Sequence, residues 1–159
     1  MYKRILVPVD GSAASSRGLI EAIGLARDQG AEILFLHVVD EWPLAAGDIA
    51  AVNLSAGAQR LRETGQELLA QAEARAHQSG VPAHSVLLEE LGVSVGECVI
   101  RRAREWPADL IICGTHGRRG ITRLLLGSTA EYIVRHAPVP VLLLRTADQD
   151  DTSAGGPKT

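Results

Sequence analysis

Short apolar runs alternate along the chain with segments in which apolar residues recur at helical spacing. Runs rich in Val, Ile and Leu predict strands, and the periodic segments between them predict helices. This alternation is typical of βαβ units, so we predict an α/β fold with a parallel sheet covered on both faces. The predicted strands are residues 5–9, 32–39, 86–88, 109–113 and 139–144, and the helices run to residue 28, over 54–78, from 95 to Pro107, and over 129–136.

Three parts of the chain depart from this pattern. Residues 40–53 contain Trp42-Pro43 and Gly47 and predict an irregular connection, a candidate for a mobile flap. Pro140 has no backbone N–H, so we expect the last strand at a sheet edge or paired outside the monomer. No periodicity remains beyond Arg145, which predicts one domain over residues 1–145 and a disordered tail over residues 146–159.

Composition narrows the classes of function. The chain has 159 residues and a formal net charge of −3, which argues against a nucleic-acid partner because such binding needs many Lys and Arg residues. No apolar run is long enough for a membrane span or a signal peptide, so we expect a cytoplasmic protein with no membrane partner. The two cysteines, Cys98 and Cys113, lie in apolar runs without metal-site spacing and fit a reducing compartment.

A glycine-rich stretch follows the fourth predicted strand. It reads Gly114, two residues, Gly117, nine residues, then Gly127-Ser128 at the start of the last helix. Ligands of open parallel sheets bind beyond the carboxyl ends of the strands, and glycines there let backbone N–H groups approach phosphate oxygens. The spacing matches neither GxxxxGK[ST] nor GxGxxG, so the P-loop and dinucleotide motifs are excluded. The stretch therefore predicts an anion site of another kind.

This spacing resembles the ATP-binding signature of the universal stress protein family. Two further blocks match the family in the right order: residues 3–12, which read KRILVPVDGS, and residues 138–143, which read PVPVLL. The strand end at 36–39, LHVV, is also similar. The resemblance implies a Rossmann-like open parallel five-stranded sheet, in the order 3-2-1-4-5, and a homodimer joined through the last strand, residues 139–145. It also implies ATP binding and a role in survival under stress.

The resemblance also implies which residues bind the nucleotide. Carried over position by position, it assigns the nucleoside to the end of the first strand, the adenine edge to the backbone of the second, and the ribose and phosphates to the glycine-rich stretch. We expect Mg²⁺ to arrive on the phosphates, with Asp10 able to help hold it. The residues expected to bind the nucleotide are Pro8, Val9, Asp10, Val38, Gly114, Gly117, Gly127, Ser128 and Thr129.

Simpler roles stay open for several of these residues. Asp10 is also a suitable turn residue or helix cap before Gly11-Ser12. Ser128 and Glu131 have the spacing of a capping box, which would exist without a ligand. The chain departs from the family at Thr129-Ala130, where a hydroxyl is lost at Ala130. Arg118, Arg119 and Arg123 are candidate phosphate contacts or ordinary surface residues, and His116 is a candidate ligand or proton donor or an ordinary loop residue. The other histidines lack metal-ligand spacing and receive no chemical role; they are His37, His77, His84 and His136.

The leading hypothesis is an ATP-binding regulatory protein of the stress response that acts as a nucleotide-dependent dimer. The alternative is a slow ATP hydrolase or a phosphoryl or adenylyl transferase using the same pocket. The chain lacks a P-loop lysine and a second carboxylate beside Asp10, which favours binding over catalysis. A third hypothesis is an interaction module that binds no nucleotide.

Overall fold

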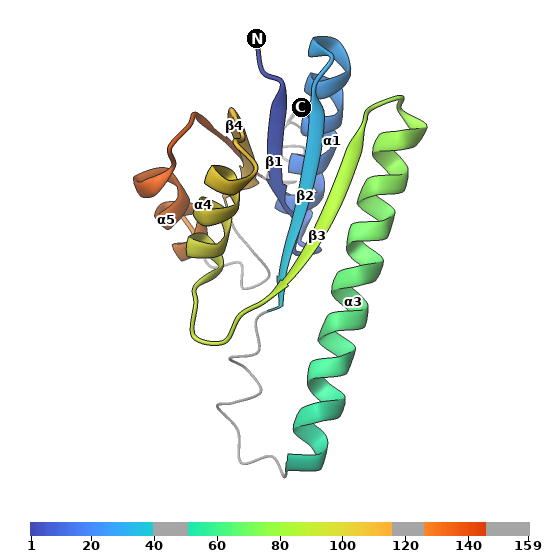
Figure 1. Cartoon of the computed structure of the whole chain (residues 1–159), viewed down its shortest axis with the longest axis vertical. Helices are drawn as coiled ribbons and strands as arrows, with labels where there is room; N and C mark the ends of the chain where they lie inside the picture. The colour runs from blue at the N-terminus through green and yellow to red at the C-terminus, as the bar shows by residue number, and fades with distance from the viewer. Residues whose placement is uncertain (40–50, 116–125, 146–159) are drawn as a thin grey trace, which may run out of the picture.

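A computed structural model of the chain describes residues 1–39, 51–115 and 126–145, and the side chains of residues 51–55 are not described. Within these ranges, five parallel strands lie in the order β3-β2-β1-β4-β5, which confirms the predicted fold class and strand order. Figure 1 shows β3, β2, β1 and β4 side by side in this order. The elements are β1 (Arg4–Pro8), α1 (Ala13–Gln29), β2 (Glu32–Val39), α3 (Ala51–Gln78), β3 (Ala83–Glu89), α4 (Val95–Glu105), β4 (Leu110–Gly114), α5 (Ser128–His136) and β5 (Val141–Leu144).

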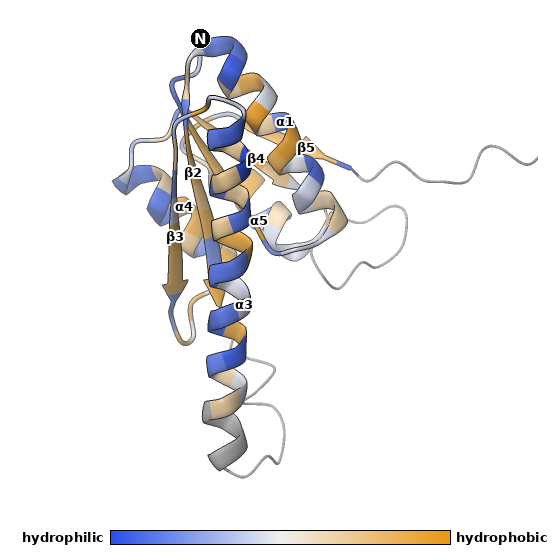
Figure 2. Ribbon diagram, turned by 90° about the vertical axis from the view of Figure 1, so that its right-hand side faces the viewer, coloured by the Kyte–Doolittle hydropathy of each residue, from blue (hydrophilic) through white to orange (hydrophobic). Residues whose placement is uncertain are grey.

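Helices cover both faces of the sheet because neighbouring strand residues point to opposite sides. Ile5 and Val7 of β1 belong to an apolar cluster that α1 and α3 close, whereas Leu6 belongs to a second cluster that α4 and α5 close. Figure 2 shows mainly apolar strands, whereas α3 alternates between polar and apolar residues along its length. None of the helices within the described ranges is long and apolar enough to cross a membrane.

Several element bounds differ from the prediction. β3 covers seven residues instead of 86–88, because Ala83, His84 and Ser85 pair with β2 although they lack an apolar pattern. The helix α3 begins at Ala51 instead of residue 54, and α5 begins at Ser128 instead of residue 129. The rest of the expected flap, residues 40–50, and the expected tail, residues 146–159, lie outside the described residues.

β5 occupies one edge of the sheet, as the position of Pro140 predicted. The strand itself begins at Val141, directly after the proline, and pairs with β4 through four residues. The Pro140 carbonyl accepts a hydrogen bond from the Ile111 N–H (N···O 3.0 Å), so the proline contributes an acceptor to the sheet without needing to donate.

Candidate functional site at the carboxyl ends of the strands

We call the carboxyl ends of β1, β2 and β4, together with the start of α5, the carboxyl edge. The β1–α1 turn places Asp10 there. Asp10 Oδ1 accepts from the Ser12 N–H (2.9 Å), and Ser12 Oγ accepts from the Ser15 N–H as the N-cap of α1 (3.1 Å). Gly11 has a φ of 79°, a conformation that favours glycine. The turn role that the sequence left open for Asp10 is therefore present.

The ladder between β1 and β2 stops at the carboxyl edge. The last paired residues are Pro8 and Leu36, and the Leu36 carbonyl then accepts from the Val9 N–H (2.8 Å). The backbone N–H and C=O of Leu36 thus point toward β1. Those of Val38 point the same way, because backbone directions in a strand repeat every two residues. At Val38 the paired part of β1 has already ended, so its N–H and C=O face the carboxyl edge.

β1 and β4 also stop pairing before their ends. The Arg4 carbonyl accepts from the Asp109 N–H (2.9 Å), so the backbone N–H and C=O groups of the even-numbered residues of β1 point toward β4. Pairing ends with Leu6 opposite Ile111. Pro8 is the next even-numbered residue, and without an N–H it cannot donate across to β4. This is the point where the strand order reverses, which is where open α/β sheets bind ligands.

Gly114 ends β4 against the first turn of α1. A Cβ at this position would lie 2.7 Å from Ala14 Cβ and 2.9 Å from the Ala14 carbonyl carbon. Both distances are shorter than real Cβ contacts, so the packing of α1 on β4 requires glycine here even without a ligand. The expected contact of Gly114 with ribose and phosphates remains a prediction.

Thr115 links β4 to both α5 and β5. Its N–H donates to the Leu144 carbonyl (2.9 Å), and its carbonyl accepts from the Gly127 N–H (2.9 Å). Gly127 is the N-cap of α5, and its peptide is thereby held beside the end of β4. The start of α5 consequently lies at the carboxyl edge, as predicted for the helix after the glycine-rich stretch.

The predicted capping box at the start of α5 is wrong. Ser128 is the first residue of the helix and not its N-cap, and no side chain of the described residues caps the helix. The Glu131 N–H donates to the Gly127 carbonyl (2.9 Å), while the Glu131 carboxylate pairs with Arg135 (2.9 Å). The first backbone N–H groups of a helix have no partner within it, and together with the helix dipole they favour an anion.

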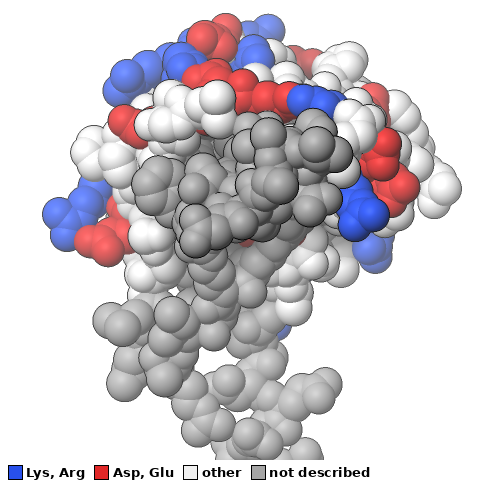
Figure 3. Space-filling view, turned by 90° about the horizontal axis from the view of Figure 1, so that it is seen from below, with Lys and Arg blue, Asp and Glu red and all other residues white. Residues whose placement is uncertain are grey.

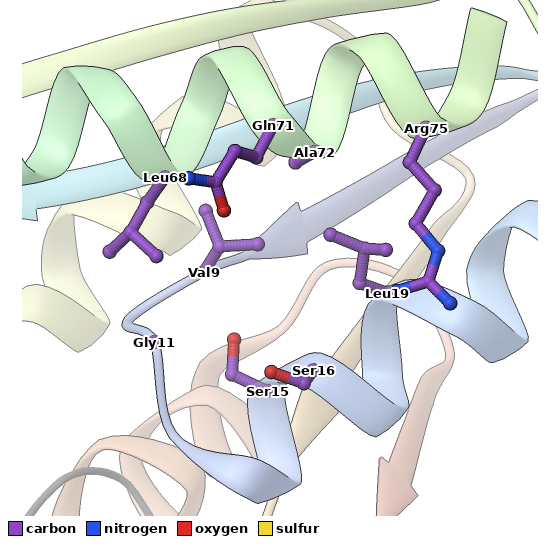
Figure 4. A pocket seen from close by; sticks show the side chains of 9 residues that line it. All are labelled: Val9, Gly11, Ser15, Ser16, Leu19, Leu68, Gln71, Ala72 and Arg75. Atoms are coloured by element: carbon purple, nitrogen blue, oxygen red, sulfur yellow. The ribbon is translucent and has the colours of Figure 1, made fainter. Parts of the chain in front are cut away.

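A small pocket of about 120 Å³ lies between α1 and α3 beside the carboxyl edge (Figure 4). Arg75 of α3 points across it toward α1, which contributes Ser15 and Ser16, while the Gln71 side chain lies near Leu68 and Val9. Of the residues predicted to bind nucleotide, Val9 alone lines this pocket. The pocket is therefore a neighbour of the predicted site and not the site itself.

In the view from below, charged side chains of both signs lie around the rim of the molecule (Figure 3). Arg62 ties α3 to the end of β3, with its Nε and Nη2 each 2.5 Å from a Glu89 carboxylate oxygen. These hydrogen bonds lower the pKa of Glu89. Among the described residues, no three His, Cys, Asp or Glu side chains gather where they would hold a metal ion.

Cys113 precedes Gly114 on β4 and is buried on the face covered by α4 and α5. Burial raises the pKa of its thiol to about 12. A thiol with such a pKa stays protonated at neutral pH and behaves as a small apolar side chain.

The structure thus brings eight of the nine predicted residues to the carboxyl edge. Gly117 lies outside the described residues, as do the candidate contacts His116, Arg118, Arg119 and Arg123. The eight residues placed there are Pro8, Val9 and Asp10 after β1, Val38 on β2, Gly114 on β4, and Gly127, Ser128 and Thr129 at the start of α5.

Sequence reasoning missed one polar residue at this edge. His37 is 5% exposed, and its Nδ1 lies 2.7 Å from the Val9 carbonyl oxygen. The available signal was a single histidine within the otherwise apolar run of β2 after Glu32, a position that a buried strand gives to a polar residue only when it has a partner.

Comparison with known proteins agrees with the fold. Residues 1–145 match the Universal stress protein family. A universal stress protein of Methanocaldococcus jannaschii is 37% identical over 145 residues, covering 91% of this chain and 83% of the relative. The crystal structure of a family member from Burkholderia pseudomallei is 36% identical, with a TM-score of 0.73 over 90% of this chain and 96% of that one. UspA from Lactobacillus plantarum is 26% identical, with a TM-score of 0.77 over 91% and 98%.

Other solved members of similar fold contain adenine nucleotides. One from Archaeoglobus fulgidus is in complex with dAMP (TM-score 0.63, 24% identity), and one from Arabidopsis thaliana has AMP bound (TM-score 0.66, 16% identity). A further universal stress protein is in complex with cAMP (TM-score 0.64, 22% identity). With the family matched over residues 1–145 and the relatives similar along most of their length, the chain belongs to the universal stress protein family.

Proposed function

We propose that the protein binds an adenine nucleotide, ATP, at the carboxyl edge and acts in the cytoplasm as a nucleotide-dependent regulator of the stress response. One observation carries the proposal: the ends of β1, β2 and β4 converge on a single edge of the sheet with the start of α5, which has no side-chain cap within the described part of the chain. The family members that contain dAMP, AMP or cAMP support the same class of ligand.

The edge offers two kinds of hydrogen-bonding group. The N–H and C=O of Val38 suit the edge of a nucleobase, which presents one acceptor beside one donor. The first N–H groups of α5 suit phosphate oxygens, which would carry Mg²⁺ and leave the protein to supply few metal ligands. In this arrangement the nucleoside contacts Pro8, Val9 and Asp10, the ribose and phosphates contact Gly114 and Gly117, and the phosphates contact Gly127, Ser128 and Thr129.

Titration calorimetry with ATP, ADP and AMP tests the proposal. We expect binding of all three, with affinity rising with the number of phosphates at the start of α5. The absence of detectable heat at millimolar nucleotide would refute nucleotide binding.

Asp10→Asn is the informative site variant. The amide oxygen can still accept from the Ser12 N–H and hold the turn, whereas the negative charge that ribose hydroxyls or Mg²⁺ would contact is lost. We expect affinity to fall about tenfold, the equivalent of about 1.4 kcal/mol, while the unfolding midpoint stays at the wild-type value. Wild-type affinity in this variant would remove Asp10 from the proposed site.

We further propose that two copies of the chain pair through β5. The carbonyls of Pro140 and Leu144 face β4, so Val141 and Leu143 present their backbone groups outward at the sheet edge. Leu142 is 36% exposed, and an apolar open edge of this kind is a template for a second strand. Thr115 bonds to both Leu144 and Gly127, which connects this edge to the phosphate side of the site.

Sedimentation velocity at micromolar concentration tests the pairing. The wild-type protein should sediment as a dimer, and Leu142→Lys should sediment as a monomer because a charged side chain at the edge blocks strand pairing. Repeating the measurement with ATP tests the nucleotide dependence. A wild-type monomer with and without ATP would rule out the proposed dimer.

A further inference from the structure

We propose that His37 is a positioning residue for the carboxyl edge. Its imidazole removes the Val9 carbonyl from the β1–β2 ladder and thereby keeps the peptide groups of Val38 open to the edge of a nucleobase. This inference rests on the proposed nucleotide-binding function, in which Val38 contacts the base. His37 acts through its two backbone neighbours and not through a contact with the ligand.

The ladder would continue by one more bond if the imidazole were absent. In a parallel pair, a residue that donates to one position on the neighbouring strand accepts from the N–H two positions further on. Val9 donates to Leu36, so the regular donor to the Val9 carbonyl is the N–H of Val38. That bond would make Val9 and His37 an additional pair, yet pairing ends with Pro8 opposite Leu36.

The side chain of His37 takes the place of that bond. Its Nδ1 lies 2.7 Å from the Val9 carbonyl oxygen. A carbonyl oxygen only accepts, so Nδ1 carries the hydrogen and donates it. A buried carbonyl needs a partner, and the imidazole supplies one without using the Val38 N–H. The sheet therefore ends without leaving Val9 unsatisfied.

The helix α3 packs against the His37 ring at Gly65. A Cβ at Gly65 would collide with His37 Cδ2, and it would lie 2.7 Å from Leu87 Cδ1 and 2.9 Å from His37 Nε2. Glycine weakens the interior of a helix, so its presence in the middle of α3 needs a reason, and the ring together with Leu87 provides one. A Cβ at Gly24 in α1 would meet nothing within 4 Å beyond its own stretch of helix, so Gly24 serves as a matched control.

Hydrogen exchange of the Val38 amide in the nucleotide-free protein tests the inference directly. In His37→Leu the Val9 carbonyl loses its donor, so the Val38 N–H should close the ladder and exchange at least about tenfold more slowly than in the wild type. In His37→Asn the Nδ2 of asparagine replaces the imidazole Nδ1 as donor, and the wild-type rate should return. An unchanged rate in His37→Leu would overturn the proposal.

Nucleotide affinity provides the second readout. We expect AMP to bind about tenfold more weakly to His37→Leu, the effect of one lost hydrogen-bonding group, and within about threefold of the wild type to His37→Asn. Gly65→Ala should lose affinity like His37→Leu because it displaces the ring, and it replaces that variant if leucine prevents folding. Gly24→Ala should bind like the wild type.

The two readouts separate this inference from the proposed function. A wild-type protein that binds no AMP would refute nucleotide binding, while hydrogen exchange at Val38 would still decide the role of His37. Wild-type AMP affinity in both His37→Leu and Gly65→Ala would refute the positioning role and leave nucleotide binding intact. Phe35→Leu, on the same strand and the same face, controls for a general loss of stability.

Discussion

The amino and carboxyl ends of the strands differ in how their backbone groups are used. At the amino ends the Asp109 carboxylate accepts from the N–H groups of both Lys3 (2.7 Å) and Arg4 (3.1 Å), and the Tyr2 N–H donates to Gln29 Oε1 (2.6 Å). At the carboxyl ends the β1–β2 and β1–β4 ladders stop early, and the N–H and C=O of Val38 lie beyond the last paired residue of β1. Among the described residues, side chains of distant segments satisfy the backbone groups at the amino ends, whereas the carboxyl ends are where we propose that a ligand binds.

Side chains reinforce the amino ends of the strands. Arg4 pairs with Glu32 of the neighbouring strand (3.0 Å), and its guanidinium lies 6.0 Å from the centre of the Trp106 ring. Exposed ion pairs contribute little on their own, so the two hydrogen bonds of Asp109 are the principal contribution there. The comparison teaches that substitutions at the amino end should affect stability alone, whereas those at the carboxyl edge should affect binding.

Gly114→Ala should have the largest effect, because the new Cβ meets the backbone of α1, which cannot move aside as a side chain can. The new Cβ would press on the backbone of Ala14, and we expect the free energy of unfolding to fall by about 1–3 kcal/mol, as for overpacked cores. Urea denaturation measures the change. Gly24→Ala, in open space, should instead raise stability by about 0.4–1 kcal/mol. Equal effects of the two alanines would contradict the close approach of α1.

Asp109→Ala removes the side-chain hydrogen bonds at the amino ends of the strands. Removing the carboxylate leaves the Lys3 and Arg4 N–H groups to water, and we expect a loss of about 1 kcal/mol in the free energy of unfolding. AMP affinity measured by calorimetry should not change, because the carboxylate lies at the opposite end of the strands. A fall in AMP affinity at temperatures where the variant is fully folded would show that the two ends are not independent.

The parallel α/β fold and the meeting of Asp10, Val38 and Gly114 at one edge were predictable from the sequence for a physical reason, whereas the strand order was implied by the family resemblance. Buried parallel strands read as continuous apolar runs, and carboxyl ends of parallel strands share one edge, so Asp10, Val38 and Gly114 had to be neighbours. The shape of the Asp10 turn was also predictable, because Gly11 and Ser12 are local turn and cap residues.

Features that depend on contacts between distant segments were not predictable. The N-cap of α5 is Gly127 and not Ser128, since its N–H is bonded to Thr115, a residue that precedes it by the whole glycine-rich stretch. The contact of Gly114 with α1 and the partner of His37 likewise arise only when the layers pack. The periodicity of a sequence predicts which face of a helix or strand a residue occupies, but not which backbone group of another element it contacts.

The starts of α4 and α5 differ in the same way, because a side chain caps α4 and none of the described side chains caps α5. We expect the smallest effect on stability from a substitution at the α4 cap. Ser94 caps α4, and hydrogen bonds from its N–H (3.0 Å) and hydroxyl (2.8 Å) hold the pKa of Glu97 below its ordinary value of 4.5. A lowered pKa in the folded state stabilises the protein above pH 4.5, and this contribution is lost as the pH falls through the folded-state pKa.

Glu97→Gln tests this cap. The amide retains the hydrogen-bonding geometry and loses the charge, so the unfolding midpoint should be lower than in the wild type at pH 7, and the two midpoints should converge in acid. Thermal unfolding followed by circular dichroism across this pH range measures the difference. A constant difference at all pH values would show that the charge of Glu97 does not contribute.

Amide chemical shifts during titration with ATP test the central claim most directly. In the ¹⁵N-labelled protein, we expect the amides of Asp10, Val38, Gly114 and Ser128 to shift together with a single affinity, while those of Lys3 and Arg4 stay in place. Shifts confined to the amino end, or no shift at the carboxyl edge at millimolar ATP, would contradict the account.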